Sequence, residues 1–394
     1  MGFEPGRRHR GDPGHAQVVG AGIAGLTLSR LLTAGGWNTE LVGTAPASPR
    51  WVTLANATRQ LIEKIWGHDI VFEVPHHELA GRRVIWGRDD AKGFVAEPML
   101  AIEATSLAAA MRRRMEAQGL AFASNAADAP SARVMRFDAR GRAASGARRG
   151  AGLRRLRVWP PMSIHSHDTR CCEVYAGDGY WAFTLPISPG LVSLQIATPD
   201  GYTHGQLRSL LAAKPPHSDS LLGIAIRTNP DQFDLQSASI EIAPALNEHM
   251  ASAQSLAVGD AAMTLDPLCG DGIGHGIKSA LLATAVANSV NLTVPFEAAM
   301  AHYVSRTTWA FLVHLSHCGA YYASIRYPGP WTGEVESGDS LRHELGAKLQ
   351  PSDLQLVVEH DPSAVVVGVN RARAVAGPSV YLRRLEPEGR TGLR

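Results

Sequence analysis

The pattern of apolar and polar residues near the start of the chain predicts a strand, a tight turn and a helix. Val18 and Val19 form a short apolar run, and the glycine-rich stretch 20–25 follows directly. The leucines at 26, 28, 31 and 32 then recur with the spacing of one helix face. A second strand is expected at 38–42. This β-α-β order is typical of a parallel sheet with helices packed on it.

Each glycine of this turn suits a dinucleotide. Gly20 permits the turn, Gly22 lets backbone N–H groups approach a pyrophosphate, and Gly25 lets the helix pack close to the strand. The positive end of the helix then faces the phosphates. An ordinary glycine-rich turn is the alternative. The acidic residue that usually ends the second strand is missing, because Gly43 and Thr44 occupy its place.

Further along the chain, alternating or β-branched stretches predict strands at 173–175, 180–185 and 192–198. We expect a helix at 204–213 and further strands at 223–226 and 238–242, which together suggest an antiparallel sheet. Helical periodicity predicts helices over 51–66, 103–119, 276–290 and 296–325. One more strand is expected at 364–369.

A second constellation makes a flavin the expected dinucleotide. A strand at 255–258 leads into Gly259 and Asp260, and a loop then feeds the start of a helix. Asp260 is placed to accept hydrogen bonds from a ribityl chain. The N–H groups of Gly272 and Ile273 can stabilise negative charge at the pyrimidine end of a reduced flavin. A glycine-rich helix start without a ligand is the alternative.

These patterns predict an α/β fold with a Rossmann-type FAD-binding domain, an antiparallel β-sheet substrate domain and C-terminal helices. The FAD-binding domain is discontinuous, at 15–155 and 250–295, and the substrate domain occupies 156–249. Residues 1–14 are expected to be a disordered basic tail, and 296–394 a helical and irregular region.

Composition and charge narrow the expected class. The 394 residues are 45% hydrophobic and 19% charged, with a formal net charge of only +2, so no nucleic-acid partner is predicted. No run of 18 apolar residues occurs, and no membrane partner is expected. The four cysteines (171, 172, 269 and 318) lack CxxC spacing, which disfavours a zinc site or a disulfide framework. We expect reduced thiols and a cytoplasmic location.

Several stretches carry a resemblance to a known family. They are FDARGRAA at 137–144, Glu173 followed by GYWAF at 179–183, DPLCG at 266–270, and AYYASIRY at 320–327. With the glycine motifs, they resemble FAD-dependent group A monooxygenases of the para-hydroxybenzoate hydroxylase fold. Within that group they are most similar to flavoproteins, related to tryptophan halogenases, that hydroxylate protein tryptophans and mature quinone cofactors such as that of quinohemoprotein amine dehydrogenase. One departure is Glu103-Ala104, where many relatives have an acid followed by an arginine that helps hold the flavin phosphates.

The resemblance implies hydroxylation of an electron-rich aromatic ring through a flavin C4a-hydroperoxide, with a protein or peptide tryptophan as the expected substrate. NAD(P)H or a separate flavin reductase would supply electrons. A flavin-dependent halogenase and a small-molecule aromatic hydroxylase remain alternatives, as does a non-catalytic FAD-binding peptide chaperone. The W-x-W-x-I-P motif of the halogenases is absent from the sequence.

Two residues are candidates for the catalytic site. His275 begins the helix on the flavin side, and Trp181 lies on a strand of the predicted substrate sheet. Packing roles are the alternative for both. His165 and His167 share one face of a strand, but no third ligand stands near them in the sequence, and no metal site is predicted.

Overall fold

The structure is a computed structural model. It describes residues 14–44, 48–87, 92–123, 134–144, 146–165, 169–234, 237–289, 294–349, 352, 354–359 and 379–384. The expected tail, apart from its last residue, and the expected strand at 364–369 lie outside these residues.

The predicted β-α-β unit is confirmed. β1 (His15–Val19) pairs in parallel with β2 (Asn38–Val42) on one side and with β9 (Val134–Asp138) on the other, and α1 (Ile23–Ala34) connects β1 to β2. The sheet has six strands in the order β18-β19-β9-β1-β2-β8. Its remaining strands are β8 (Ala121–Ala123), β18 (Ala251–Ser252) and β19 (Ser255–Ala257). The buried leucines of α1 belong to the largest apolar core of the described residues.

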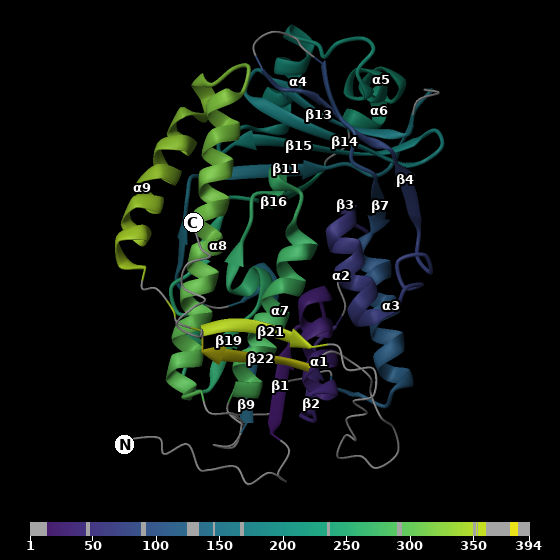
Figure 1. The fold of residues 1–394 in the computed structure, drawn as a ribbon. Helices are drawn as coiled ribbons and strands as arrows, with labels where there is room; N and C mark the ends of the chain where they lie inside the picture. Colours follow the sequence, from purple (N-terminus) through teal and green to yellow (C-terminus); the bar gives the residue numbers. More distant parts are fainter. Residues whose placement is uncertain are drawn as a thin grey trace.

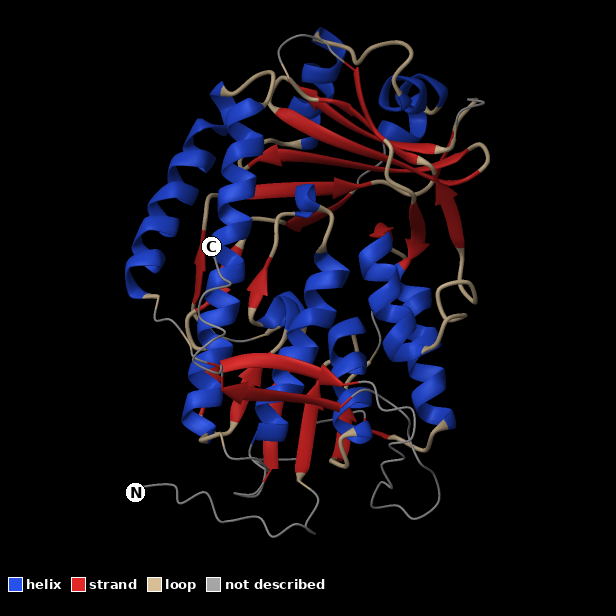
Figure 2. Cartoon of the chain, viewed as in Figure 1, coloured by secondary structure: helices blue, strands red, loops and turns tan. Residues whose placement is uncertain are grey.

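A larger sheet of eight strands lies above the six-stranded sheet in the view of Figure 1. Its pairs are antiparallel, as predicted, except that β13 runs parallel to β5. Helices α4 (His204–Ala213), α5 (Leu221–Thr228) and α6 (Pro230–Asp234) lie on its outer side (Figure 2). The strands are β5 (Gly81–Ile85), β6 (Lys92–Val95), β11 (Arg154–Val158), β12 (Met162–Ser163), β13 (Cys171–Gly177), β14 (Tyr180–Ser188), β15 (Leu191–Pro199) and β16 (Ala238–Glu241).

Two predicted elements differ from the structure. The helix expected over 51–66 is confirmed only at 56–66, as α2 (Asn56–Trp66), and its first five residues form a strand, β3 (Trp51–Ala55). β3 pairs antiparallel with β7 (Met99–Glu103), which also pairs with β4 (His76–Leu79), and these long-range hydrogen bonds override the local periodicity. The strand expected at 223–226 lies within α5, which Ser220 caps by accepting the Gly223 N–H.

Three long helices follow the second sheet in the chain. α7 (Gly272–Ser289) packs against α1, and α8 (Phe296–Ser324) runs beside α9 (Thr332–Lys348) along one side of the molecule (Figure 1). The remaining described elements are α3 (Ala104–Ala117), β10 (Arg148–Gly150), β17 (Ala245–Asn247), β20 (Met263–Thr264), β21 (Leu354–Glu359) and β22 (Ser379–Arg384). Within the described residues, no helix has the length and apolarity that a membrane span requires.

Candidate functional site

A cavity of about 360 Å³ lies between helices α1 and α7 and the larger sheet. Its wall includes the start of α1, the start of α7, the loop before α7 and two residues of the sheet. Two helix N-termini therefore face one space, and each presents backbone N–H groups that suit an anion.

The three glycines of the turn at 20–25 have different structural roles. Gly22 lines the cavity, is the N-cap of α1, and would place a Cβ with nothing within 4 Å. Gly20 has a φ of +118°, and a Cβ there would lie 2.3 Å from the Ala139 carbonyl oxygen. A Cβ on Gly25 would lie 1.9 Å from the Gly20 carbonyl oxygen. Gly20 and Gly25 thus shape the turn, and Gly22 faces the open space.

The second group of predicted cofactor-binding residues, at 259–273, also contributes to the cavity wall. Asp260, Gly272 and Ile273 line it, whereas Gly259 supports the wall from behind. Gly259 has a φ of +62°, and a Cβ there would approach the Cβ of Ala24 on α1 to 2.9 Å. Four of the seven residues predicted to bind the cofactor therefore contact the cavity directly, and the other three set its backbone geometry.

Glu103 holds two cavity-lining residues in place, a role that the sequence did not predict. Its carboxylate caps α3 by accepting the N–H groups of Thr105 at 3.0 Å and Ser106 at 2.6 Å, and it also accepts the Arg50 N–H at 2.8 Å. Burial opposes the charge of Glu103, yet these hydrogen bonds lower its pKa. Arg50 and Thr105 both line the cavity. A carboxylate directly before a helical stretch was the signal that could have revealed this cap.

The larger sheet contributes Phe183 and Gln195 to the cavity wall. Trp181 is not among the described lining residues; it is only 2% exposed, and its indole N–H donates to the Tyr322 hydroxyl at 3.0 Å. His275 is also buried outside the lining, with an Nε2 atom that has no hydrogen-bond partner among the described contacts. Burial lowers the pKa of His275. The structure thus gives neither predicted catalytic residue a direct contact with the cavity.

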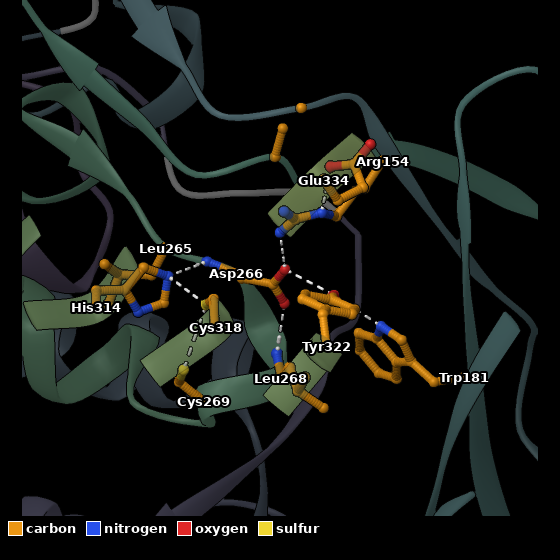
Figure 3. A network of polar contacts seen from close by, with 12 residues as sticks. Arg154, Trp181, Leu265, Asp266, Leu268, Cys269, His314, Cys318, Tyr322 and Glu334 are labelled. Carbon is orange, nitrogen blue, oxygen red and sulfur yellow. Dashed lines mark hydrogen bonds and ion pairs between the residues drawn. The ribbon is translucent and has the colours of Figure 1, made fainter. Parts of the chain in front are cut away.

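At the cavity wall, Asp266 is the centre of a buried polar network (Figure 3). Its carboxylate accepts the Leu268 N–H at 2.9 Å, accepts the Tyr322 hydroxyl at 2.9 Å, and pairs with Arg154. Arg154 also pairs with Glu334 of α9 at 2.7 Å. Burial opposes the charge of Arg154, but Tyr322, Asp266 and Glu334 together raise its pKa. This network fixes the loop whose Asp266 and Pro267 line the cavity.

The described residues also bring three potential metal ligands together, although no metal site was predicted. Ligand atoms of Cys269, His314 and Cys318 all lie within 4.8 Å of one another. Two of these residues come from α8 and one from the loop before α7. Their separation along the chain explains why spacing gave no signal for this cluster.

Comparison with known proteins supports the predicted fold. No protein-family model and no curated protein sequence matches the chain. Among solved structures, QhpG, described as a peptidyl tryptophan dihydroxylase essential for tryptophylquinone cofactor biogenesis, aligns with a TM-score of 0.67 and 17% identity, covering 95% of this chain and 88% of its own. The flavin-dependent halogenase CmlS has a TM-score of 0.68 at 13% identity, with 87% and 71% covered.

A third similar structure is PqsL from Pseudomonas aeruginosa, described as a probable FAD-dependent monooxygenase. Its TM-score is 0.65 at 16% identity, covering 82% of this chain and 100% of its own. The chain has the fold that these flavin-dependent proteins share. The resemblance inferred from the sequence motifs is therefore confirmed at the level of the fold.

Proposed function

We propose that the protein is an FAD-dependent monooxygenase that hydroxylates an electron-rich aromatic ring, a tryptophan side chain presented by a polypeptide. The observation that carries the proposal is the cavity, in which two glycine-rich helix starts meet a sheet on a fold shared with flavin enzymes. The likeness to a peptidyl tryptophan dihydroxylase over 95% of the chain supports the polypeptide substrate.

The cavity residues fit the parts of FAD. The open space at Gly22 suits a pyrophosphate, which the N–H groups at the start of α1 would bind. Asp260 would accept hydrogen bonds from the ribityl hydroxyls. Gly272 also leaves open space, and the start of α7 would stabilise negative charge on the flavin ring. Bound FAD supplies the activation of oxygen, while the protein orients the substrate and excludes water.

The charged residues favour hydroxylation over halogenation. The halogenases that the sequence resembles use an active-site lysine, and none of the described lining residues is a lysine. Lys278, on α7, has a side chain that is 61% exposed and pairs with Asp271 at 2.8 Å. The cavity wall contains the aromatic ring of Phe183 instead, which suits a flat aromatic substrate. The electron donor, NAD(P)H or a separate flavin reductase, stays a prediction.

The test supplies the purified protein with FAD, NADH, a flavin reductase, oxygen and tryptophan-bearing polypeptides, first those encoded beside its gene. We expect mass spectrometry to show one or two added oxygen atoms on a tryptophan. The control is Gly22→Leu, whose side chain would fill the pyrophosphate space. Omitting the reductase shows whether NADH alone suffices.

Three results would contradict the proposal. A halogenated product in the presence of chloride or bromide would assign the protein to the halogenases. Turnover of free phenols without any polypeptide activity would assign it to the small-molecule hydroxylases. FAD binding with no oxygen consumption on any substrate would favour a non-catalytic peptide chaperone.

A further inference from the structure

Two cysteines far apart in the sequence lie side by side behind the flavin cavity. Cys269 ends the short 3₁₀ helix Pro267–Cys269, and Cys318 lies on α8. Their Sγ atoms are 3.8 Å apart, although 49 positions separate them along the chain (Figure 3). Pro267 and Gly270, on either side of Cys269, line the cavity. Both thiols are free.

His314 lies beside the two thiols and determines which of them donates its proton to the other. Its Nε2 atom accepts the Asp266 N–H at 2.8 Å and lies 3.3 Å from the Cys318 sulfur, one helical turn further along α8. Because Nε2 uses its one lone pair to accept the Asp266 N–H, it carries no proton, and the Cys318 thiol is left to donate toward the sulfur of Cys269. The hydrogen bond from Cys318 lowers the pKa of Cys269, and the same bond raises the pKa of Cys318.

The two thiols also differ in access to solvent. Cys269 is half-buried, whereas Cys318 is only 3% exposed. A solvent-accessible thiolate is the form that attacks peroxide, and a neighbouring buried thiol can resolve the product. The geometry therefore assigns Cys269 the role of attacking sulfur and Cys318 that of resolving sulfur.

We propose that Cys269 is a peroxide-modification site, and that Cys318 resolves its oxidised form into a disulfide. The oxidant is hydrogen peroxide from any source, so the proposal does not depend on the substrate of the enzyme. Cys269 loses its proton, its thiolate attacks one peroxide oxygen, and the O–O bond breaks. The hydroxide that leaves takes up that proton as water. Cys269 becomes a sulfenic acid.

In the second step the Cys318 sulfur attacks the sulfur of Cys269 and passes its proton to the hydroxyl of the sulfenic acid. The S–O bond breaks, and the hydroxyl leaves as water with that proton. Overall, two thiols are oxidised by two electrons, and one peroxide is reduced to two waters. The Sγ separation must fall from 3.8 Å to about 2 Å. Closing the disulfide tethers the wall of the flavin cavity to α8.

The same cluster could instead bind a metal ion, and the contacts argue against it. A metal on Nε2 of His314 would displace the Asp266 N–H and leave that buried donor unpaired. The Asp266 carboxylate cannot serve as a fourth ligand without leaving Arg154, Tyr322 or the Leu268 N–H. Oxidation keeps all of these bonds.

The test treats the reduced, full-length protein with an equimolar amount of hydrogen peroxide and maps its peptides without reduction. We expect a cross-linked peptide containing Cys269 and Cys318, loss of two of the four free thiols, and full recovery with dithiothreitol. Cys318→Ser should instead accumulate sulfenic acid on Cys269, which dimedone traps. Cys269→Ser should give neither product. Cys171→Ser, a matched control, should still form the cross-link.

Two results would overturn the proposal. One is a thiol count unchanged by peroxide, or equal oxidation of all four cysteines. The other is stoichiometric zinc in the purified protein, or tight binding of added zinc, that Cys269→Ser abolishes. Thermal melts of each variant establish that it is folded before its thiols are counted.

Discussion

The buried network around Asp266 offers the sharpest prediction about stability. We expect Asp266→Asn to lower the free energy of unfolding strongly, because it removes the negative charge and leaves the shape almost unchanged. Asp266 accepts bonds from Arg154, Tyr322 and the Leu268 N–H. Arg154 is only 2% exposed, so its guanidinium cannot turn to water when its partner is lost.

Removing one partner of a buried ion pair costs about 3–5 kcal/mol. We expect a value near the lower end, about 3 kcal/mol, since Glu334 still pairs with Arg154. Unfolding entropy is about 2.1 cal/mol/K per residue, which gives about 0.8 kcal/mol/K for the 394 residues. The melting temperature should therefore fall by about 4 to 6 °C over the full range of cost.

Differential scanning calorimetry on the apo-protein measures this fall. The matched control is Asp339→Asn, which removes an exposed pair with Arg342 at 3.1 Å and should change stability by less than about 0.5 kcal/mol. Adding Arg154→Met to Asp266→Asn should cost less than the sum of the two single changes. If Asp266→Asn melts like the control, or if the two changes are additive, the network does not hold the loop as described.

Three further predictions concern single positions. Gly25→Ala should prevent stable folding, because its Cβ would lie 1.9 Å from the Gly20 carbonyl oxygen, and a circular dichroism melt like that of the wild type would contradict this. Asp260→Ala should weaken FAD binding and leave the apo-protein melting temperature unchanged, as fluorescence titration and melting can show; equal affinity would exclude Asp260 as a ligand. Burial raises the pKa of Glu173 above its ordinary 4.5, so its contribution to stability is lost as pH rises above about 4.5. Glu173→Gln should therefore gain stability relative to the wild type as pH rises above about 4.5, and a pH-independent difference in melting temperature would refute that.

The elements that the sequence predicted well depend on contacts close in the chain. The turn at Gly20 and Gly25 and the start of α7 carry their signal within a few residues, because glycine marks each close backbone approach. β3 was missed because its strand state comes from pairing with β7, almost 50 residues later. α5 was missed because a short apolar run fits either a buried strand or a helix.

The buried contacts of the site could not be predicted from the sequence. Asp266 is 112 residues from Arg154, and Arg154 is 180 residues from Glu334, so no local pattern connects them. Trp181 carried an aromatic signal, but only the structure shows that its indole supports Tyr322 and that Phe183 faces the cavity. Cys269 and Cys318 likewise meet only in the fold.

The central claim is that the cavity binds FAD through the open space at Gly22. The most direct measurement is a titration of the purified apo-protein with FAD, followed by flavin fluorescence, for the wild type and for Gly22→Leu. A Cβ at Gly22 meets nothing in the protein, so the variant should melt like the wild type. We expect saturable binding of one FAD per chain for the wild type and none for Gly22→Leu. No binding by the wild type, or equal binding by both proteins, would contradict the account.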